Sequence, residues 1–349
     1  MRENFNFAPM KKNIAITLPA EWAPQRAVQL TWPHADTDWA PLLEDAERCF
    51  ADIANAIAAR QSLLVVCRDA DAVRPMIHPH LWEAVRFEEI DSNDTWARDH
   101  GPITVFEDGH PMLLDFKFNG WGLKFAADKD NLITRQLFER NCFPPDTSYL
   151  NCLNFVLEGG SIESDGCGTL LTTSECLLSP NRNGAFSKIE IEVELRRYLG
   201  VERILWLNNG YLAGDDTDSH IDTLARFCDE RTIAYVRCTD PEDEHFEALS
   251  RMEEELRAFR QADGSPYRLV PLPMAEAVYE EEGQRLPATY ANFLIINGAV
   301  LLPFYDSPLD ALALEVLQAV FPDREIVGID CLPLIRQHGS LHCVTMQLY

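Results

Sequence analysis

The sequence predicts an α/β fold in a single domain, because strand-like and helix-like segments alternate along the chain. The composition is that of a globular protein, with 46% hydrophobic and 25% charged residues among 349. No long Gly/Ser-rich linker and no abrupt change in composition divides the chain. We therefore expect one domain over residues 18–349, preceded by an extension over residues 1–17 whose first dozen residues are flexible.

Short apolar runs predict strands, and longer segments with apolar residues three or four positions apart predict helices. The segments AVQLTW (27–32) and SLLVVC (62–67) are typical of buried strands, and the amphipathic segment 39–60 between them is typical of a helix. We expect further strands over residues 111–116, 169–178, 204–207, 232–237, 268–271, 293–296, 299–302, 325–329 and 344–348, and further helices over 130–139, 189–199, 242–262 and 308–320. Neither a GxGxxG motif after a strand nor a GxxxxGK[ST] motif occurs, which argues against nucleotide-binding folds of those kinds.

The chain is strongly acidic, with 30 Lys and Arg against 56 Asp and Glu and a formal net charge of −26. Nucleic acids and anionic membranes require a positive surface, so we expect neither as a partner. Such a surface would attract small cations, although an acidic surface also serves solubility alone. The longest apolar run, over residues 292–304, contains Asn and Gly and is too short to cross a bilayer.

Ten cysteines are present, and none of them forms a CxxC pair, so zinc-ribbon spacing is absent. Lys11 and Lys12 are followed by only a short apolar stretch before the charged Glu21, which does not resemble a secretory signal. We therefore expect a reduced, cytoplasmic protein in which most cysteines are small buried hydrophobic residues.

Four segments combine reactive side chains with turn residues: NDTWARDHGP (93–102), LEGGS (157–161), DDTDSHIDTLARF (215–227) and QHGSLHCVTMQ (337–347). In the last segment Cys343 follows a turn of small residues, where a substrate could reach the thiol from the loop side. A buried core cysteine is the alternative. His342 is not expected to assist Cys343, because adjacent side chains of an extended segment point to opposite faces.

His220 and Asp222 lie two residues apart, so in an extended segment both would face one ligand. This pair suits a catalytic site or a metal site, and a solvated acidic loop is the alternative. Trp96 and Asp99 are a pairing that suits a planar cation, through a π face and charge-assisted hydrogen bonds. Glu158 precedes two glycines, which allow close approach of the backbone. Each of these two segments alone would also be compatible with an ordinary turn.

Together the four segments supply the residue types that hydrolysis of a guanidinium group requires. Two carboxylates can each accept a pair of N–H bonds from this planar cation. Its central carbon is a poor electrophile, for which a thiolate is a suitable nucleophile. A histidine can protonate the departing ammonia and then activate water.

These segments resemble the agmatine deiminase family, within the guanidine-modifying superfamily that includes bacterial peptidylarginine deiminase and arginine deiminase. The resemblance covers nearly the whole chain from Leu18, in the ordered blocks LPAEWAPQRAVQLTWP, WARDHGP, LEGGS, LLSPNRN, DDTDSHIDTLARF, YANFLIINGAVLLPFYD, FPDREIVGID and GSLHC. It implies a propeller-like α/β barrel (the pentein fold) of five ββαβ modules around a pseudo-fivefold axis, with the active site in the central channel. It also implies no cofactor and no metal, and the family often forms homo-oligomers.

The resemblance further implies the roles of seven residues. Cys343 would be the nucleophile that forms a covalent amidino-thioether, His220 the general acid and then base, and Glu158 the residue that orients His220. Asp99 and Asp222 would clamp the guanidinium. Trp96 would pack near the guanidinium, and Asp216 would bind the distal amine of the substrate. The chain departs from the family pattern at His338-Gly339-Ser340, where GGN or GGG is common, and at Asp216, where Glu is usual.

The expected activity is hydrolysis of agmatine to N-carbamoylputrescine and ammonia, a step toward putrescine and polyamines. We expect the charge of the guanidinium itself, or an imidazolium at His220, to favour the Cys343 thiolate, because Asp99 and Asp222 oppose it. Peptidylarginine or free arginine are alternative substrates. A non-catalytic polyamine-binding protein is an alternative of another class, and so is a metal-dependent hydrolase built on His220, Asp222, Asp215 and His100.

Overall fold

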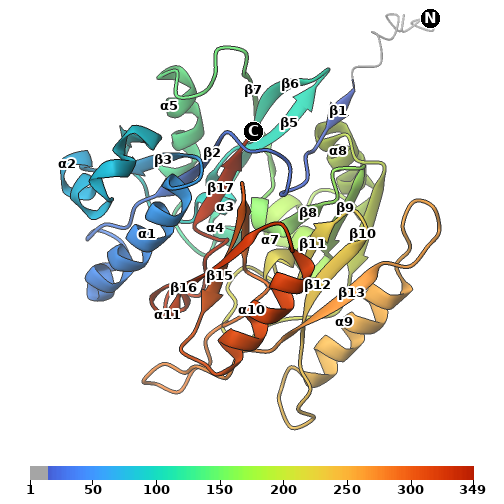
Figure 1. Cartoon of the computed structure of the whole chain (residues 1–349). Helices are drawn as coiled ribbons and strands as arrows, with labels where there is room; N and C mark the ends of the chain where they lie inside the picture. Colours follow the sequence, from blue (N-terminus) through green and yellow to red (C-terminus); the bar gives the residue numbers. More distant parts are fainter. Residues whose placement is uncertain (1–14) are drawn as a thin grey trace, which may run out of the picture.

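A computed structural model of the chain describes residues 15–349 (Figure 1). The predicted flexible segment at the start of the chain lies outside the described residues. The last residues of the predicted extension, Ile16–Thr17, form the short strand β1, which pairs with β5. The strands of residues 15–349 form five separate sheets, so the predicted α/β class is confirmed.

All five sheets repeat one unit of three strands, in which the first two strands are antiparallel and the second and third are parallel. The units are β5 (Ile103–Glu107), β6 (His110–Lys117) and β7 (Ser148–Val156); β8 (Ile162–Ser164), β9 (Thr169–Thr173) and β10 (Arg203–Leu207); β11 (Ala225–Asp229), β12 (Thr232–Arg237) and β13 (Arg268–Pro273); β14 (Leu294–Ile296), β15 (Ala299–Phe304) and β16 (Glu325–Asp330); and β17 (Thr345–Leu348), β2 (Ala27–Thr31) and β3 (Ser62–Cys67). Strand β4 (Val85–Glu89) extends the last sheet beside β3.

A helix connects the two parallel strands of every unit, as parallel strands require a long crossover. These helices are α1 (Leu43–Ala58), α5 (Ile133–Glu139), α8 (Lys188–Leu199), α9 (Phe246–Ala258) and α10 (Leu309–Val320). Helix α1 shows why the sequence folds in this way. Its buried side chains, among them Phe50, Ile53 and Ile57, recur every three or four residues and face the core.

The last strand of the chain shares a sheet with strands from the first hundred residues. The C-terminal strand β17 pairs antiparallel with β2 near the N-terminus, and Figure 1 shows this strand (dark red) in the interior beside β2. The pairing fixes the residues that precede β17, among them Cys343, next to segments from the beginning of the chain.

The predicted helices are confirmed, with shifted ends. The 3-10 turn Ala40–Leu42 precedes α1, and the 3-10 turn Asp130–Leu132 precedes α5. Helix α9 is shorter than predicted at both ends. The strand predicted over 169–178 is wrong in its second half, where Ser174–Leu177 forms helix α6. This helix begins there because the Thr173 hydroxyl accepts a hydrogen bond from the Cys176 backbone at its N-terminus. Strands β4, β5, β7, β8 and β11 were not expected from the sequence.

No helix within residues 15–349 has both the length and the apolar character that a bilayer crossing would need. All ten cysteines lie in the described part of the chain and are unpaired there, as the sequence predicts for a reduced protein.

Candidate active site

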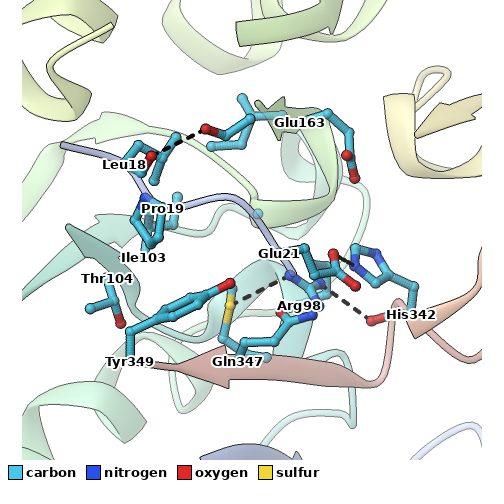
Figure 2. A pocket seen from close by; sticks show the side chains of 14 residues that line it. Leu18, Pro19, Glu21, Arg98, Ile103, Thr104, Glu163, His342, Gln347 and Tyr349 are labelled. Atoms are coloured by element: carbon cyan, nitrogen blue, oxygen red, sulfur yellow. Dashed lines mark hydrogen bonds and ion pairs between the residues drawn. The ribbon is translucent and has the colours of Figure 1, made fainter. Parts of the chain in front are cut away.

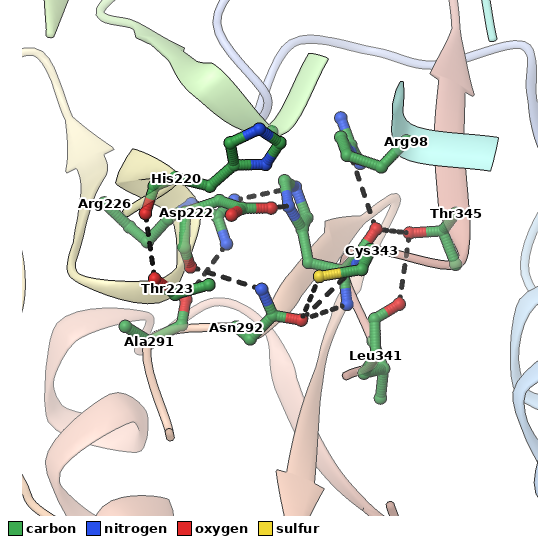
Figure 3. Close-up of polar contacts among 12 residues, drawn as sticks. Arg98, His220, Asp222, Thr223, Arg226, Ala291, Asn292, Leu341, Cys343 and Thr345 are labelled. Carbon is green, nitrogen blue, oxygen red and sulfur yellow. Dashed lines mark hydrogen bonds and ion pairs between the residues drawn. The ribbon is translucent and has the colours of Figure 1, made fainter. Parts of the chain in front are cut away.

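Cys343 lies in a tight turn rather than at the start of a strand. The Thr345 backbone N–H donates to the His342 carbonyl at 3.1 Å, and β17 begins only at Thr345. The Asn292 side-chain oxygen accepts the backbone N–H of His342 at 2.9 Å and lies 3.4 Å from the Cys343 sulfur (Figure 3). Arg98 donates its backbone N–H to the Cys343 carbonyl at 3.1 Å. The turn is therefore held by two segments far from it in sequence.

Asp99 sits on the single-turn helix α3 (Ala97–His100) and is buried. One of its carboxylate oxygens accepts the Trp121 indole N–H at 2.9 Å, and the other accepts the Gly160 backbone N–H at 3.0 Å. Burial, together with the nearby charges of Asp222 and Glu158, raises the pKa of Asp99 well above its ordinary value. A cation placed beside this carboxyl would relieve both effects.

His220 and Asp222 do not form the extended pair that their spacing predicts. Ile221–Thr223 is a 3-10 turn, closed by the Thr223 hydroxyl, which donates to the His220 carbonyl at 2.8 Å. The two side chains nevertheless converge with Asp99 around Gly160. A Cβ at Gly160 would lie 2.6 Å from His220 Nδ1, 3.0 Å from Asp222 Oδ2 and 3.0 Å from Asp99 Oδ1. Only glycine leaves room for all three groups.

Asp222 is fully buried and has one fixed and one free oxygen. Its Oδ2 accepts a hydrogen bond from His342 Nδ1 at 2.7 Å, while Oδ1 has no partner within residues 15–349. Burial alone would raise the pKa of Asp222, but the hydrogen bond from His342 and the nearby charge of Arg226 outweigh it and lower this pKa. Asp222 is therefore an ionised carboxylate with one oxygen that has no hydrogen-bond partner among the described residues.

His220 is a buried imidazole whose two ring nitrogens have no hydrogen-bond partner among the described residues. Its Nδ1 lies 3.7 Å from Asp99 Oδ1. Burial lowers the pKa of His220 to about 3, so the ring is neutral at neutral pH in the free protein. An imidazolium at His220 was one of two positive charges expected to favour the Cys343 thiolate. It is therefore not present before a ligand binds.

Glu158 forms a buried ion pair with Arg182 of helix α7 (Pro180–Asn183). The Arg182 Nε lies 2.9 and 3.1 Å from the two Glu158 oxygens, and neither side chain is exposed. Burial raises the pKa of Glu158, and the charge of Arg182 opposes this effect. Glu158 also lies near His220, with a carboxylate oxygen within 4.8 Å of a ring nitrogen, but makes no hydrogen bond to it.

A cavity of about 250 Å³ opens beside Cys343. Of the predicted site residues, Trp96, Asp99, Asp216 and Cys343 line it. Its other lining residues are Asp38, Asp94, Trp121, Phe125, Thr217, Gln337, His338 and Gly339. The wall thus carries four aspartates and neither lysine nor arginine. His220, Asp222 and Glu158 are not in the wall. His220 Nδ1 lies 3.7 Å from Oδ1 of the wall residue Asp99, and Asp222 converges with both of them around Gly160.

Asp216 lies in this wall, and its contact with a distal amine stays a prediction. The neighbouring Lys124 donates to the Asp216 backbone carbonyl at 2.6 Å and to the Asp218 carboxylate at 2.7 Å, not to the Asp216 carboxylate. Trp96 is fixed by its indole N–H, which donates to Asp94 at 3.0 Å, and its ring meets Trp121 edge-on at 6.1 Å.

The Cys343 thiol is buried, and its pKa is raised well above the ordinary value. Burial is the main cause, and the charges of Asp222 and Asp99 add to it, as the sequence predicts for the two carboxylates. The free protein therefore holds a protonated thiol.

The sequence analysis missed Asn292, Trp121, Arg182 and His342. No local spacing connects the first three to the reactive residues. The extended conformation expected around His342 and Cys343 is wrong, because the segment turns, and the His342 ring contacts Asp222.

The four residues of the alternative metal site, His220, Asp222, Asp215 and His100, do not form a ligand cluster in residues 15–349. The clusters with suitable spacing are Glu158–Cys176–His220 and Glu21–Glu163–His342. An arginine contacts each of them: Arg182 occupies both oxygens of Glu158, and Arg226 binds both Glu21 and Glu163. A second cation would be repelled at either cluster.

Comparison with known proteins gives a consistent result over the whole chain. The family model described as Porphyromonas-type peptidyl-arginine deiminase matches residues 17–348. A Porphyromonas gingivalis protein named a putative arginine deiminase is 60% identical with a TM-score of 0.92, covering 95% of this chain and 98% of that one. The agmatine deiminase of C. jejuni, solved with substrate bound, is 37% identical with a TM-score of 0.88 and 99% coverage of both chains. The agmatine deiminase of Pseudomonas aeruginosa is 34% identical over 95% of this chain and 94% of its own length.

Proposed function

Because the chain belongs to the Porphyromonas-type peptidyl-arginine deiminase family, we propose that it is an agmatine deiminase. It is a hydrolase of amidine C–N bonds that converts agmatine and water into N-carbamoylputrescine and ammonia, a step that leads toward polyamines. The catalytic residues are Cys343, His220 and Glu158, and the substrate is bound by Asp99, Asp222, Trp96 and Asp216.

The negative charge of the cavity is the observation that favours agmatine over arginine as the substrate. Agmatine has a positive charge at each end, and four aspartates line the cavity without a lysine or arginine. A free or peptide-bound arginine would place a carboxylate or a peptide carbonyl near these aspartates, and the wall offers no lysine or arginine to receive it. About 250 Å³ is below the roughly 300–1,000 Å³ of sites for drug-sized ligands, which suits a short linear molecule.

In the first half of the reaction, the bound guanidinium favours deprotonation of the Cys343 thiol that attacks it. The cation binds between Asp99 and the free oxygen of Asp222, and its charge offsets the two carboxylates that raise the pKa of Cys343. The thiol proton passes to neutral His220, and the sulfur attacks the guanidinium carbon. The imidazolium then donates this proton to the leaving nitrogen, ammonia departs, and an amidino-thioether remains on Cys343.

The second half returns the enzyme to its starting state. Water gives a proton to His220 and its oxygen attacks the amidino carbon. The C–S bond breaks, and Cys343 recovers its proton from His220. The new C–OH group loses its proton to solvent, where the released ammonia takes one up, and the neutral ureido product leaves. Glu158, paired with Arg182 beside His220, stabilises the imidazolium that forms in each half. The low pKa of His220 makes it a strong acid at the step that releases ammonia.

We propose that the five repeated units form a five-bladed propeller around a pseudo-fivefold axis within one domain over residues 18–349. The repetition of the unit in all five sheets supports it. The site draws on loops from several units, as it would at a common axis. The ten unpaired cysteines favour a cytoplasmic location. We expect a homo-oligomer, with neither nucleic acid nor membrane as a partner.

Arginine is the second candidate substrate, because the relative that is 60% identical is named for arginine. The purified protein is incubated separately with agmatine, free arginine and a peptidyl-arginine, and the ureido product is quantified by colorimetry. Cys343→Ala serves as the blank in each case. We expect product from agmatine, absent in the variant. If arginine alone gives product, arginine is the substrate in place of agmatine. If none of the three compounds is turned over, the proposal is wrong.

A further inference from the structure

The imidazole of His342 links the active site to a buried charged cluster on its other side. Its Nδ1 lies 2.7 Å from Asp222 Oδ2, and its Nε2 lies 2.8 Å from Glu21 Oε2 and 3.1 Å from an Arg226 nitrogen. Figure 2 shows the ring beside Glu21 at a small cavity of about 70 Å³, which Glu163 and Arg98 also line.

The proton on His342 Nδ1 is fixed by the partners of the ring. The Asp222 carboxylate can only accept a hydrogen bond, so Nδ1 must be the donor. Burial and the charges of Arg226 and Arg98 lower the pKa of His342, which favours a neutral ring. In that state Nε2 is an acceptor for Arg226, and the two nitrogens have opposite roles. An imidazolium between Asp222 and Glu21 would also donate from Nδ1.

The other side of the ring is anchored to a rigid frame. Arg226 is fully buried and donates to the Glu163 and Glu21 carboxylates and to the backbone carbonyls of Ala291 and Phe293. The backbone of His342 is held as well, since Asn292 accepts its N–H at 2.9 Å. These contacts fix the ring, so its Nδ1 stays within hydrogen-bond distance of Asp222.

We propose that His342 is a positioning residue for the guanidinium site, which holds Asp222 by one oxygen and leaves the other oxygen for the substrate. This inference rests on the proposed deiminase function. Within residues 15–349, His342 is the one donor to the Asp222 carboxylate. Without it, the carboxylate would be buried beside Asp99 with no hydrogen bond, and it would turn or bind a proton. Either change weakens the clamp before chemistry begins.

Two variants separate the two nitrogens of the ring. In His342→Asn the amide nitrogen is bonded to Cγ, as Nδ1 is, so it can still donate to Asp222. In His342→Gln the amide nitrogen lies one atom further along the side chain, as Nε2 does, and reaches toward Glu21 instead. We expect His342→Asn to keep KM for agmatine within about threefold of the parent value, and His342→Gln to raise it more than about thirtyfold. Both are measured by steady-state kinetics of the full chain.

His245 provides a matched control for the effect of losing a buried imidazole. Its Nδ1 lies 2.7 Å from Asp243, and its Nε2 accepts the Ala213 backbone N–H at 2.8 Å. His245→Gln should lower the unfolding midpoint and leave KM unchanged. If His342→Gln and His342→Asn change KM equally, or if Gln retains more function than Asn, the inference is wrong. An inactive parent protein would instead remove the proposed function on which the inference rests.

The parent protein gives a second test if neither His342 variant folds. With ¹⁵N-labelled histidine, NMR should show at least two buried rings protonated at Nδ1, and one of these signals should disappear in His245→Gln. If no Nδ1-protonated ring then remains, His342 does not donate to Asp222 and the inference is overturned.

Discussion

A single methyl group at Gly160 should reduce catalysis strongly without unfolding the protein. An added Cβ would lie 2.6 Å from His220 Nδ1 and 3.0 Å from both Asp222 Oδ2 and Asp99 Oδ1. These three groups belong to the proposed acid–base residue and the guanidinium clamp. Gly160→Ala therefore displaces all three groups at once, while it removes no charge and no functional side chain.

The expected magnitude follows from the overlap. Ordinary non-bonded contacts are about 3.5 Å, so His220 must move by roughly 0.9 Å. A displacement of about 1 Å in an active site can cost about a hundredfold in rate. Overpacking in a core costs roughly 1–3 kcal/mol, which a domain of ordinary stability withstands. We expect kcat for agmatine to fall about a hundredfold, with an unfolding free energy lowered by about 2 kcal/mol.

Gly109→Ala is the control for stability. Gly109 lies between β5 and β6 with φ of +85°, and no atom lies within 4 Å of its added Cβ. Alanine there costs roughly 1–2 kcal/mol through backbone strain but does not touch the site. Steady-state kinetics and urea unfolding are measured for both variants. If Gly160→Ala retains kcat within twofold of the parent, the proposed convergence of the three side chains is not required for catalysis.

Three further predictions concern single buried or cavity-lining carboxyl groups. Glu158→Gln removes one of the two carboxylates that pair with buried Arg182, leaving Asp218, and should lower the free energy of unfolding in urea by about 1–3 kcal/mol; an unchanged stability would contradict the ion pair. Asp216→Asn should raise KM for agmatine about tenfold with little change in kcat, and an unchanged KM in steady-state kinetics would exclude a contact with the amine. Burial raises the pKa of Asp130 to about 7, so the folded protein retains a proton that the unfolded chain loses near pH 4. Stability should fall by about 1.4 kcal/mol from pH 6 to pH 8 because of this group, and the fall in Asp130→Asn should be smaller by that amount; equal pH dependence in both proteins would show that Asp130 keeps an ordinary pKa.

Local patterns predict the helices and most buried strands, because an element that buries one face has apolar residues at regular positions along the sequence. Strand β7 was missed because half-buried and exposed positions dominate its first residues, and β8 is only three residues long. The residues around Cys343 look extended in sequence, yet a hydrogen bond donated by the Arg98 backbone and another accepted by the Asn292 side chain hold them in a turn. Such contacts join segments 50 or more positions apart, and local sequence patterns do not predict them.

The composition of the site is more predictable than its electrostatics. Cys343, Asp99, Trp96 and Asp216 were expected from residue types and resemblance, and all of them line one cavity. The roles of His342 and Glu21 depend on a contact between residues 321 positions apart. The neutral state of His220 likewise follows from its burial, which sequence spacing does not reveal.

The most direct test of the account is a search for the covalent intermediate on Cys343. The protein is mixed with agmatine, quenched in acid within a turnover, digested and analysed by mass spectrometry. We predict that the peptide containing Cys343 gains the mass of agmatine less ammonia, and that Cys343→Ala gains nothing. An adduct on another cysteine such as Cys176, or turnover that continues in Cys343→Ala, would contradict the proposed mechanism.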